Sequence, residues 1–308
     1  MKRLSQCLCV AALAVFSAPV SAQDGVAAPD GSQTVTLTLL HEKDKPTWTD
    51  IEIARGAPLL RVMVNGQIVC GLIDTGSSHT AVDNDFAKTQ GLKVFANNRL
   101  AKATSGTIQT FRVAGVPVEL PGQFRFQADL IGIELPDYDC PGGGKLTFVL
   151  GLDILKFLTM GIDAPRKKVI FLRSGSINLR GDNWARFDWI EGQVVGKISG
   201  QPARLRIDTG SSSLLLVPAN RFDTFFAGTT LETLDASTDA AGRKESNVGI
   251  RNVPVSLGDL TISSEAKRVA ADDRPHDANL GFPFFIWTFT IFDSGQNLIA
   301  MRLPELKK

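Results

Sequence analysis

The sequence predicts a mostly β protein made of two homologous β lobes. Short runs in which apolar and polar residues alternate recur along the chain, separated by Gly, Pro, Asn and Asp turn signals. Helical periodicity is confined to three short segments, residues 83–90, 153–157 and 219–226. A set of short sequence motifs, called landmarks below, also recurs in the same order about 130 residues further along the chain. Strand periodicity and the internal repeat together predict this fold class.

The expected strands are short and are distributed over both halves of the chain. Residues 34–39 show the alternation most clearly, and a Gly or Pro turn signal bounds most of the other runs. The further expected strands cover residues 60–64, 68–73, 116–120, 169–172, 193–198, 253–257 and 298–303.

The repeat begins with one hexapeptide. Ile-Asp-Thr-Gly-Ser-Ser occupies residues 73–78 and again 207–212. A Gly-Gln pair starts eight residues before each aspartate, and an aspartate lies 12 residues after the glycine of each Leu-Gly pair. Chance explains one shared motif but not an ordered set, so we expect two lobes related by a pseudo-twofold axis. The remaining paired landmarks are Val-Pro-Val at 116–118 and 253–255 and Leu-Gly at 150–151 and 280–281.

The first 22 residues resemble a secretory signal peptide. Lys2 and Arg3 precede an apolar run over residues 8–16, and small residues end the segment at Ala22. The run is too short to span a bilayer, so no stable membrane anchor is expected. The expected organisation is a signal peptide (1–22), a flexible leader (23–33), a first lobe (34–175) and a second lobe (176–308). The expected location is the Gram-negative periplasm or the exterior of the cell.

Composition argues against several classes of partner. The chain has 308 residues, 44% of them hydrophobic and 21% charged, with a formal net charge of +1. This is an ordinary globular mixture, and it gives no reason to expect nucleic acid or an anionic membrane as the main partner.

The repeated hexapeptide carries the candidate chemistry, with Asp74 and Asp208 as the catalytic pair. Each aspartate follows an apolar strand, so the strand delivers a carboxylate to the end of a buried ladder. A pseudo-twofold axis would bring the two carboxylates face to face. Glycine permits a tight turn, threonine can bond across the seam between the lobes, and serine can reach the carboxylate. These supporting residues are Thr75, Gly76, Ser77, Thr209, Gly210 and Ser211.

The paired Asp-Thr-Gly motifs and Leu-Gly pairs resemble those of the pepsin and retropepsin superfamily of aspartic proteases, over most of residues 55–305. The resemblance implies two carboxylates that share one proton and activate a water without metal or cofactor. In that superfamily an apolar-apolar-Gly element crosses behind each catalytic turn. Residues 149–151 fit this pattern, whereas Asn279 departs from it by being polar.

The resemblance also implies β-hairpin flaps that close over a substrate. The candidate tips are Ser105-Gly106 in the first lobe and Ala241-Gly242 in the second, although each could be an ordinary surface hairpin. The flap tyrosine of pepsins is missing, since the only tyrosine is Tyr138. With two expected flaps and lobes of about 130 residues, the chain resembles two fused retropepsin-like lobes, a bacterial exported form, more than it resembles a pepsin.

Two cysteines remain after the signal peptide, Cys70 and Cys140. An exported protein meets oxidising conditions, so either a disulfide or two buried thiols is expected. The three histidines show no metal-ligand spacing, and no metal site is predicted.

The predicted function is an aspartic endopeptidase that acts on peptides or proteins as a monomer, because one chain supplies both aspartates. The alternative is a non-catalytic peptide- or partner-binding protein on the same scaffold. A processing protease dedicated to one substrate would have the same active site, so the sequence does not separate it from a general protease.

Overall fold

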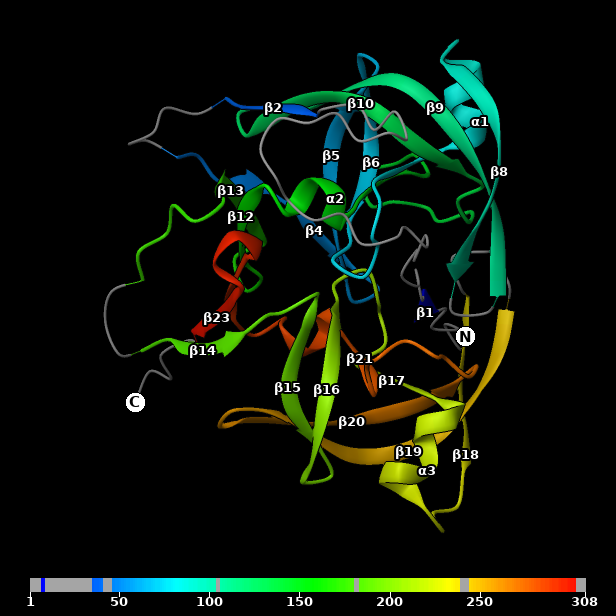
Figure 1. Cartoon of the computed structure of the whole chain (residues 1–308), viewed down its shortest axis with the longest axis vertical. Coiled ribbons are helices and arrows are strands. Elements are labelled where there is room, and N and C mark those ends of the chain that lie inside the picture. The colour runs from blue at the N-terminus through cyan, green and yellow to red at the C-terminus, as the bar shows by residue number, and fades with distance from the viewer. Residues whose placement is uncertain are drawn as a thin grey trace.

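Strands dominate the computed structural model, which describes residues 7–8, 35–40, 46–103, 106–179, 183–238 and 244–302. They form three sheets, one in each lobe and one shared between the two halves of the chain (Figure 1). The prediction of a mostly β fold is confirmed. No helix within the described ranges has the length and apolar character needed to cross a membrane.

The first lobe is built on a nine-stranded sheet. Its strands are β2 (Thr36–Leu39), β4 (Glu52–Ala54), β5 (Ala57–Val64), β6 (Gln67–Ile73), β7 (Ala81–Asp83), β8 (Lys93–Ala103), β9 (Gly106–Leu120), β10 (Phe124–Ile133) and β11 (Leu146–Leu150). Six of them follow the order β10-β7-β11-β6-β5-β9, and β9 pairs back with β10. This closure makes a barrel-like ring around an apolar interior.

The second lobe repeats this ring strand for strand. Its sheet contains β1 (Cys7–Leu8), β15 (Gln193–Ile198), β16 (Gln201–Asp208), β17 (Leu215–Pro218), β18 (Glu232–Thr238), β19 (Lys244–Leu257), β20 (Leu260–Val269) and β21 (Ala278–Gly281). The ring order is β20-β17-β21-β16-β15-β19, closed by the pairing of β19 with β20. The short β1, within the expected signal peptide, pairs in parallel with β18.

A six-stranded sheet joins the two halves. It runs β14-β23-β22-β12-β13-β3, so each half of the chain contributes three strands and β12 meets β22 in the middle. The expected lobe boundary between residues 175 and 176 lies on the connection from β13 to β14. The bounds are β3 (Thr49–Asp50), β12 (Leu158–Asp163), β13 (Lys168–Arg173), β14 (Ala185–Asp188), β22 (Phe289–Asp293) and β23 (Leu298–Arg302).

The helical elements are few and short. They are α1 (Asn84–Thr89), α2 (Leu152–Leu155), α3 (Ala219–Phe226) and the 3₁₀ turns η1 (Phe282–Phe284) and η2 (Ser294–Gln296). The Asp83 carboxylate caps α1 by accepting the Phe86 N–H at 2.8 Å. Helix α3 buries Phe222, Phe225 and Phe226 against the second lobe, as its apolar spacing predicts.

Two of the repeated sequence landmarks meet in space. Asn65-Gly66 and Ser199-Gly200 form the turns of the β5–β6 and β15–β16 hairpins, with positive φ at both residues of each turn. The Asn65 N–H donates to the Pro117 carbonyl at 2.9 Å, and the Ser199 N–H donates to the Pro254 carbonyl at 2.8 Å. Each Val-Pro-Val landmark therefore holds the hairpin that leads to its aspartate.

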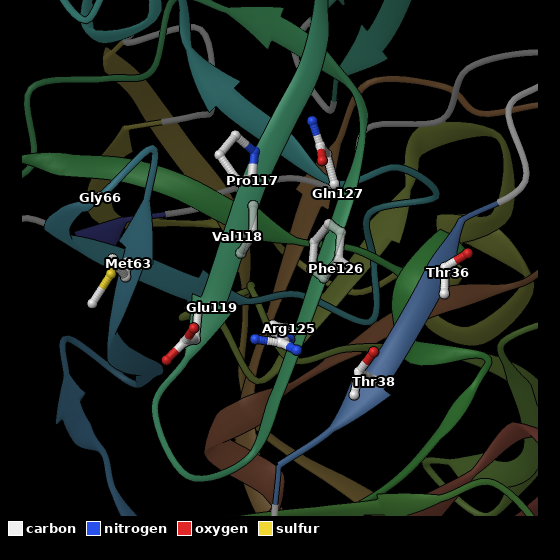
Figure 2. Close-up of a pocket in the computed structure, with 10 residues that line it drawn as sticks. All are labelled: Thr36, Thr38, Met63, Gly66, Pro117, Val118, Glu119, Arg125, Phe126 and Gln127. Atoms are coloured by element: carbon white, nitrogen blue, oxygen red, sulfur yellow. The ribbon is translucent and has the colours of Figure 1, made fainter.

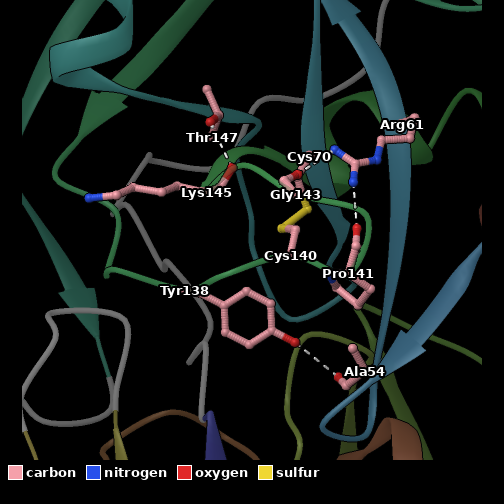
Figure 3. Close-up of a disulfide and its surroundings, with 9 residues drawn as sticks. All are labelled: Ala54, Arg61, Cys70, Tyr138, Cys140, Pro141, Gly143, Lys145 and Thr147. Carbon is pink, nitrogen blue, oxygen red and sulfur yellow. Dashed lines mark hydrogen bonds between the residues drawn. A yellow bond between two sulfur atoms is a disulfide. The ribbon is translucent and has the colours of Figure 1, made fainter.

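A disulfide joins Cys70 to Cys140 across 70 residues of sequence, with 6.4 Å between the Cα atoms (Figure 3). It ties the connection between β10 and β11 to β6, the strand that ends at Asp74. Further bonds hold the same connection, since the Arg61 guanidinium donates to the Gly143 carbonyl at 2.9 Å and the Tyr138 hydroxyl to the Ala54 carbonyl at 3.2 Å. Tyr138 thus serves the disulfide region and not a flap.

We predict that the Cys70→Ser/Cys140→Ser double variant loses about 4 kcal/mol of unfolding free energy, because the bridge closes a long loop in the unfolded chain. Urea unfolding of oxidised wild type and variant would measure the loss. Reductant should bring the wild type to the midpoint of the variant and leave the variant unchanged. Equal midpoints for oxidised and reduced wild type would contradict the prediction.

Candidate active site

Two strands deliver the two aspartates to the interface between the lobes. Asp74 follows β6 directly, and Asp208 is the last residue of β16. Each strand has a parallel neighbour on one side, β11 or β21, and an antiparallel hairpin partner on the other. Both side chains are 0% exposed. The structure thus brings together the two residues that the repeat singled out.

Each carboxylate packs against the glycine of the opposite turn. A Cβ atom on Gly76 would lie 2.4 Å from Asp208 Cγ, and a Cβ on Gly210 would lie 2.5 Å from Asp74 Cγ. Neither glycine has a positive φ. The glycines are therefore needed for their missing Cβ atom, as the sequence predicts, and not for a positive φ. Glycine is required because the other lobe's carboxylate occupies the space of a side chain.

The two threonines lock the turns together across the interface. The Thr75 hydroxyl donates to the Ile207 carbonyl at 3.0 Å and accepts the Thr209 N–H at 3.1 Å. The Thr209 hydroxyl donates to the Ile73 carbonyl at 2.8 Å and accepts the Thr75 N–H at 2.9 Å. These four buried bonds form a closed, two-fold-related set that fixes the position of one turn relative to the other.

The serines do not act as predicted. The Ser77 hydroxyl donates to the His79 carbonyl at 2.7 Å, and the Ser211 hydroxyl donates to the Ser213 carbonyl at 3.0 Å. Both hydroxyls thus bond within their own turns and not to the carboxylates. Asp74 Oδ1 is held instead by backbone, accepting the Gly76 N–H at 2.8 Å and the Ser77 N–H at 3.1 Å.

The two carboxyl groups interact with each other as well as with the turns. A hydrogen bond links the Asp74 and Asp208 carboxyl groups, and the Ser211 backbone also bonds to Asp208. The pair can therefore hold one proton between its two carboxyl groups.

The Leu-Gly landmarks pass directly behind the turns. The Leu150 carbonyl accepts the Asp74 N–H at 3.0 Å, and a Cβ on Gly151 would lie 2.4 Å from the His79 carbonyl carbon. In the second lobe the Phe282 N–H donates to the Ser211 carbonyl at 3.1 Å, and a Cβ on Gly281 would lie 2.0 Å from the Ser213 oxygen. Backbone crosses backbone here, so only glycine fits.

Burial dominates the electrostatics of the pair. Burial, and then the neighbouring Asp208 charge, raises the pKa of Asp74 well above its ordinary value. Burial also raises the pKa of Asp208, while the positive charge of Arg206 opposes the rise. The pair therefore retains a proton at a pH where isolated aspartates are ionised.

Arg206 is a site residue that the sequence reasoning missed. It lies on β16, is only 8% exposed, and donates from Nη2 to the carbonyl oxygen of Gly76 in the opposite turn. Burial, and then the charge of Arg274, lowers the pKa of Arg206 to about 10, so it stays charged at neutral and acid pH. Its signal was present in the sequence, as a charged residue between the apolar Leu205 and Ile207 and two positions before Asp208.

A second buried polar cluster lies in the second lobe and comprises Asp272, Arg274 and His276. Arg274 Nε donates to Asp272 Oδ2 at 2.6 Å, and His276 Nε2 lies 3.7 Å from the same oxygen. Burial alone would raise the pKa of Asp272, but the Arg274 guanidinium holds it well below its usual range. Burial, followed by the charges of Arg274 and Arg206, lowers the pKa of His276 to about 3.

Two long hairpins, β8–β9 and β18–β19, flank the predicted flap tips in sequence. Gly106 begins β9 opposite Ala103 in β8, while Ser105 lies outside the described residues. In the second lobe β18 and β19 pair up to Thr238 and Lys244, and Ala241 and Gly242 lie outside the described residues. In Figure 1 the two hairpins extend from their lobes along the same side of the molecule.

A separate pocket of about 330 Å³ lies on the first lobe (Figure 2). Strands β2, β5, β9 and β10 line it, and no residue of the Asp-Thr-Gly turns takes part. Within the described part of the chain, no three His, Cys, Asp or Glu side chains lie together as a metal-binding group.

We predict that Thr75→Val destabilises the fold by about 2–4 kcal/mol, because it leaves the buried Thr209 N–H and Ile207 carbonyl without a partner. Thr75→Ser is the matched control, since it keeps the hydroxyl and should lose far less. Urea unfolding of both variants measures the difference. Indistinguishable stabilities for Val and Ser would show that the interlobe bonds contribute little.

A second prediction concerns stability against pH. Between pH 6.5 and about 3 the unfolded chain protonates His276 and the folded protein does not, so the histidine makes stability fall as the pH is lowered. His276→Gln should therefore lose less stability than wild type between pH 6.5 and 4, by up to about 1.4 kcal/mol per pH unit. Parallel stability curves for the two proteins would refute this.

Comparison with known proteins bears on both lobes. The sequence profile described as aspartyl protease matches residues 60–154. None of the curated proteins compared with the chain is similar in sequence. Among solved structures, the aspartic proteinase from Irpex lacteus superposes with a TM-score of 0.55 at 11% identity, covering 86% of this chain and 99% of that one.

The profile match contains Asp74 and ends within α2, so it covers most of the first ring and its Asp-Thr-Gly turn. The structural match extends over both rings and shows the pepsin-like fold. The first lobe is thus similar in sequence to aspartyl proteases, and the whole chain is similar in fold to an aspartic proteinase.

Proposed function

We propose that the protein is an aspartic endopeptidase in which Asp74 and Asp208 activate a water molecule. The observation that carries the proposal is the reciprocal packing of each carboxylate on the opposite glycine. This packing keeps both carboxylates buried and adjacent, which gives the pair a shared proton to work with.

The proposed reaction needs only that proton and a water. The ionised carboxylate takes a proton from water while the water oxygen bonds to the peptide carbonyl carbon, and the protonated carboxyl transfers its proton to the carbonyl oxygen, which gives a gem-diol. When the C–N bond breaks, the amine leaves with the proton taken from water, and one diol hydroxyl returns its proton to the other carboxylate as it becomes the carbonyl oxygen. One water is consumed, an acid and an amine are released, and the pair is again singly protonated.

The proposed substrate is an extended peptide or protein segment bound between the lobes. The β8–β9 hairpin ends its sheet at β8, which offers main-chain groups for pairing with an added strand. A monomer suffices because one chain supplies both turns. We also propose export to the periplasm or the exterior, supported by the charged, apolar and small-residue pattern of residues 1–22.

The test is cleavage of a diverse peptide library between pH 3 and 7, read by mass spectrometry, with and without a pepstatin-type inhibitor. Asp74→Asn and Asp208→Asn should each lower cleavage by about 10²–10⁴-fold or more, because neither can exchange the proton. Asp259→Asn, at an exposed turn, is the control and should cleave like wild type.

Unchanged cleavage by a folded Asp208→Asn variant would overturn the proposed mechanism. A folded wild type that cleaves no peptide at any pH would favour the non-catalytic binding protein, because the two lobes and their hairpins would remain without the chemistry.

A further inference from the structure

We propose that Arg206 is a positioning residue of the proposed catalytic pair, holding the first turn and supplying the countercharge that sets the working pH range. The inference rests on the proposed peptidase function. It concerns a residue of β16 that belongs to neither Asp-Thr-Gly motif.

Strand geometry places Arg206 beneath the pair. Alternate residues of a strand share one face, so Arg206 lies on the same face of β16 as Asp208, while Leu205 and Ile207 enter the core. Its guanidinium crosses to the other lobe and donates to the Gly76 carbonyl, the backbone on which the Asp208 carboxylate packs. The corresponding residue of the first lobe is the buried Leu72, so only one lobe provides this group.

Arg206 has no ion-pair partner of its own. No carboxylate lies within 4.0 Å of its guanidinium among the described residues, although the side chain is almost fully buried. Arg274 is neutralised by Asp272. A buried cation needs a compensating negative charge, and the charges of Asp208 and Asp74 act on Arg206 more strongly than that of Asp272.

Asn279 belongs to the same arrangement. It faces Arg206 in the parallel register of β16 and β21, and it is the polar residue that departs from the apolar-apolar-Gly pattern. Arg206 Nη1 and Asn279 Oδ1 both lack a hydrogen-bond partner within the described residues. The departure from the pattern therefore accompanies the buried arginine.

The charged groups around Arg206 are Asp74, Asp208, Asp272, Arg274 and His276. Between pH 4 and 7 Asp272 stays ionised and His276 stays neutral. Within this set, only the aspartate pair changes its charge over that range. A fixed positive charge beside it lowers both of its macroscopic pKa values, so removing the charge should move the whole activity profile to higher pH.

The test compares pH profiles of kcat/KM for wild type and Arg206→Gln. The acid limb and the basic limb of the profile should both move to higher pH, by about one pH unit. A shift of this size is typical of losing an opposite charge at close range. Arg204→Gln is the matched control, because it removes the same charge from the same strand face at a side chain that is 53% exposed. Its limbs should stay within about 0.2 pH units, since solvent screens that charge.

Two further variants separate charge from shape. Arg206→Lys keeps the charge but loses the planar fork, so its limbs should stay in place while kcat falls. Asn279→Asp leaves Arg206 intact and adds a carboxylate beside it, so its limbs should move upward. This variant carries the test if Arg206→Gln does not fold, as judged by near-UV circular dichroism.

The inference would be overturned if the pH profile of folded Arg206→Gln or Asn279→Asp did not move. It would also be overturned if the profile of Arg206→Lys moved upward as far as that of Arg206→Gln. Carboxyl ¹³C NMR of the aspartates gives the titration of the pair without any cleavage. A wild type that cleaves nothing would therefore contradict the proposed function. The NMR titration would still test the role of Arg206.

Discussion

The packing of each buried carboxylate on the opposite glycine is the constraint on which the rest of the structure depends. It requires that β6 and β16 end at the same place, that no side chain stands at residues 76 or 210, and that the two turns hold a fixed separation. The four threonine bonds provide that separation. The Leu-Gly segments close the rear of each turn, and the shared six-stranded sheet joins the lobes beneath them.

The two lobes share a backbone plan but support their aspartates by different means. In the first lobe a disulfide anchors β6 at Cys70, four residues before Asp74. In the second lobe a charged residue, Arg206, stands two residues before Asp208, and an ion pair of Asp272 and Arg274 lies nearby. The first lobe thus supports its aspartate strand with a covalent bond, and the second lobe does so with buried charged residues.

This difference has an electrostatic consequence. A symmetric pair of buried aspartates would have two equivalent carboxylates, whereas here Arg206 adds a positive charge from one lobe only. This asymmetry arises from a residue outside the repeated hexapeptide, which is identical in both halves.

The sequence by itself determined the lobes, the repeat and the identity of the paired aspartates, because strand periodicity and ordered motifs are local properties of the chain. The reason for glycine at residues 76 and 210 came only from the tertiary structure, since the atoms that exclude a side chain belong to the other lobe. The serine bonds and the Cys70–Cys140 bridge were likewise decided in space. Arg206 was visible as a charge in an apolar strand, but its partner lies 130 residues away, and only folding brings the two together.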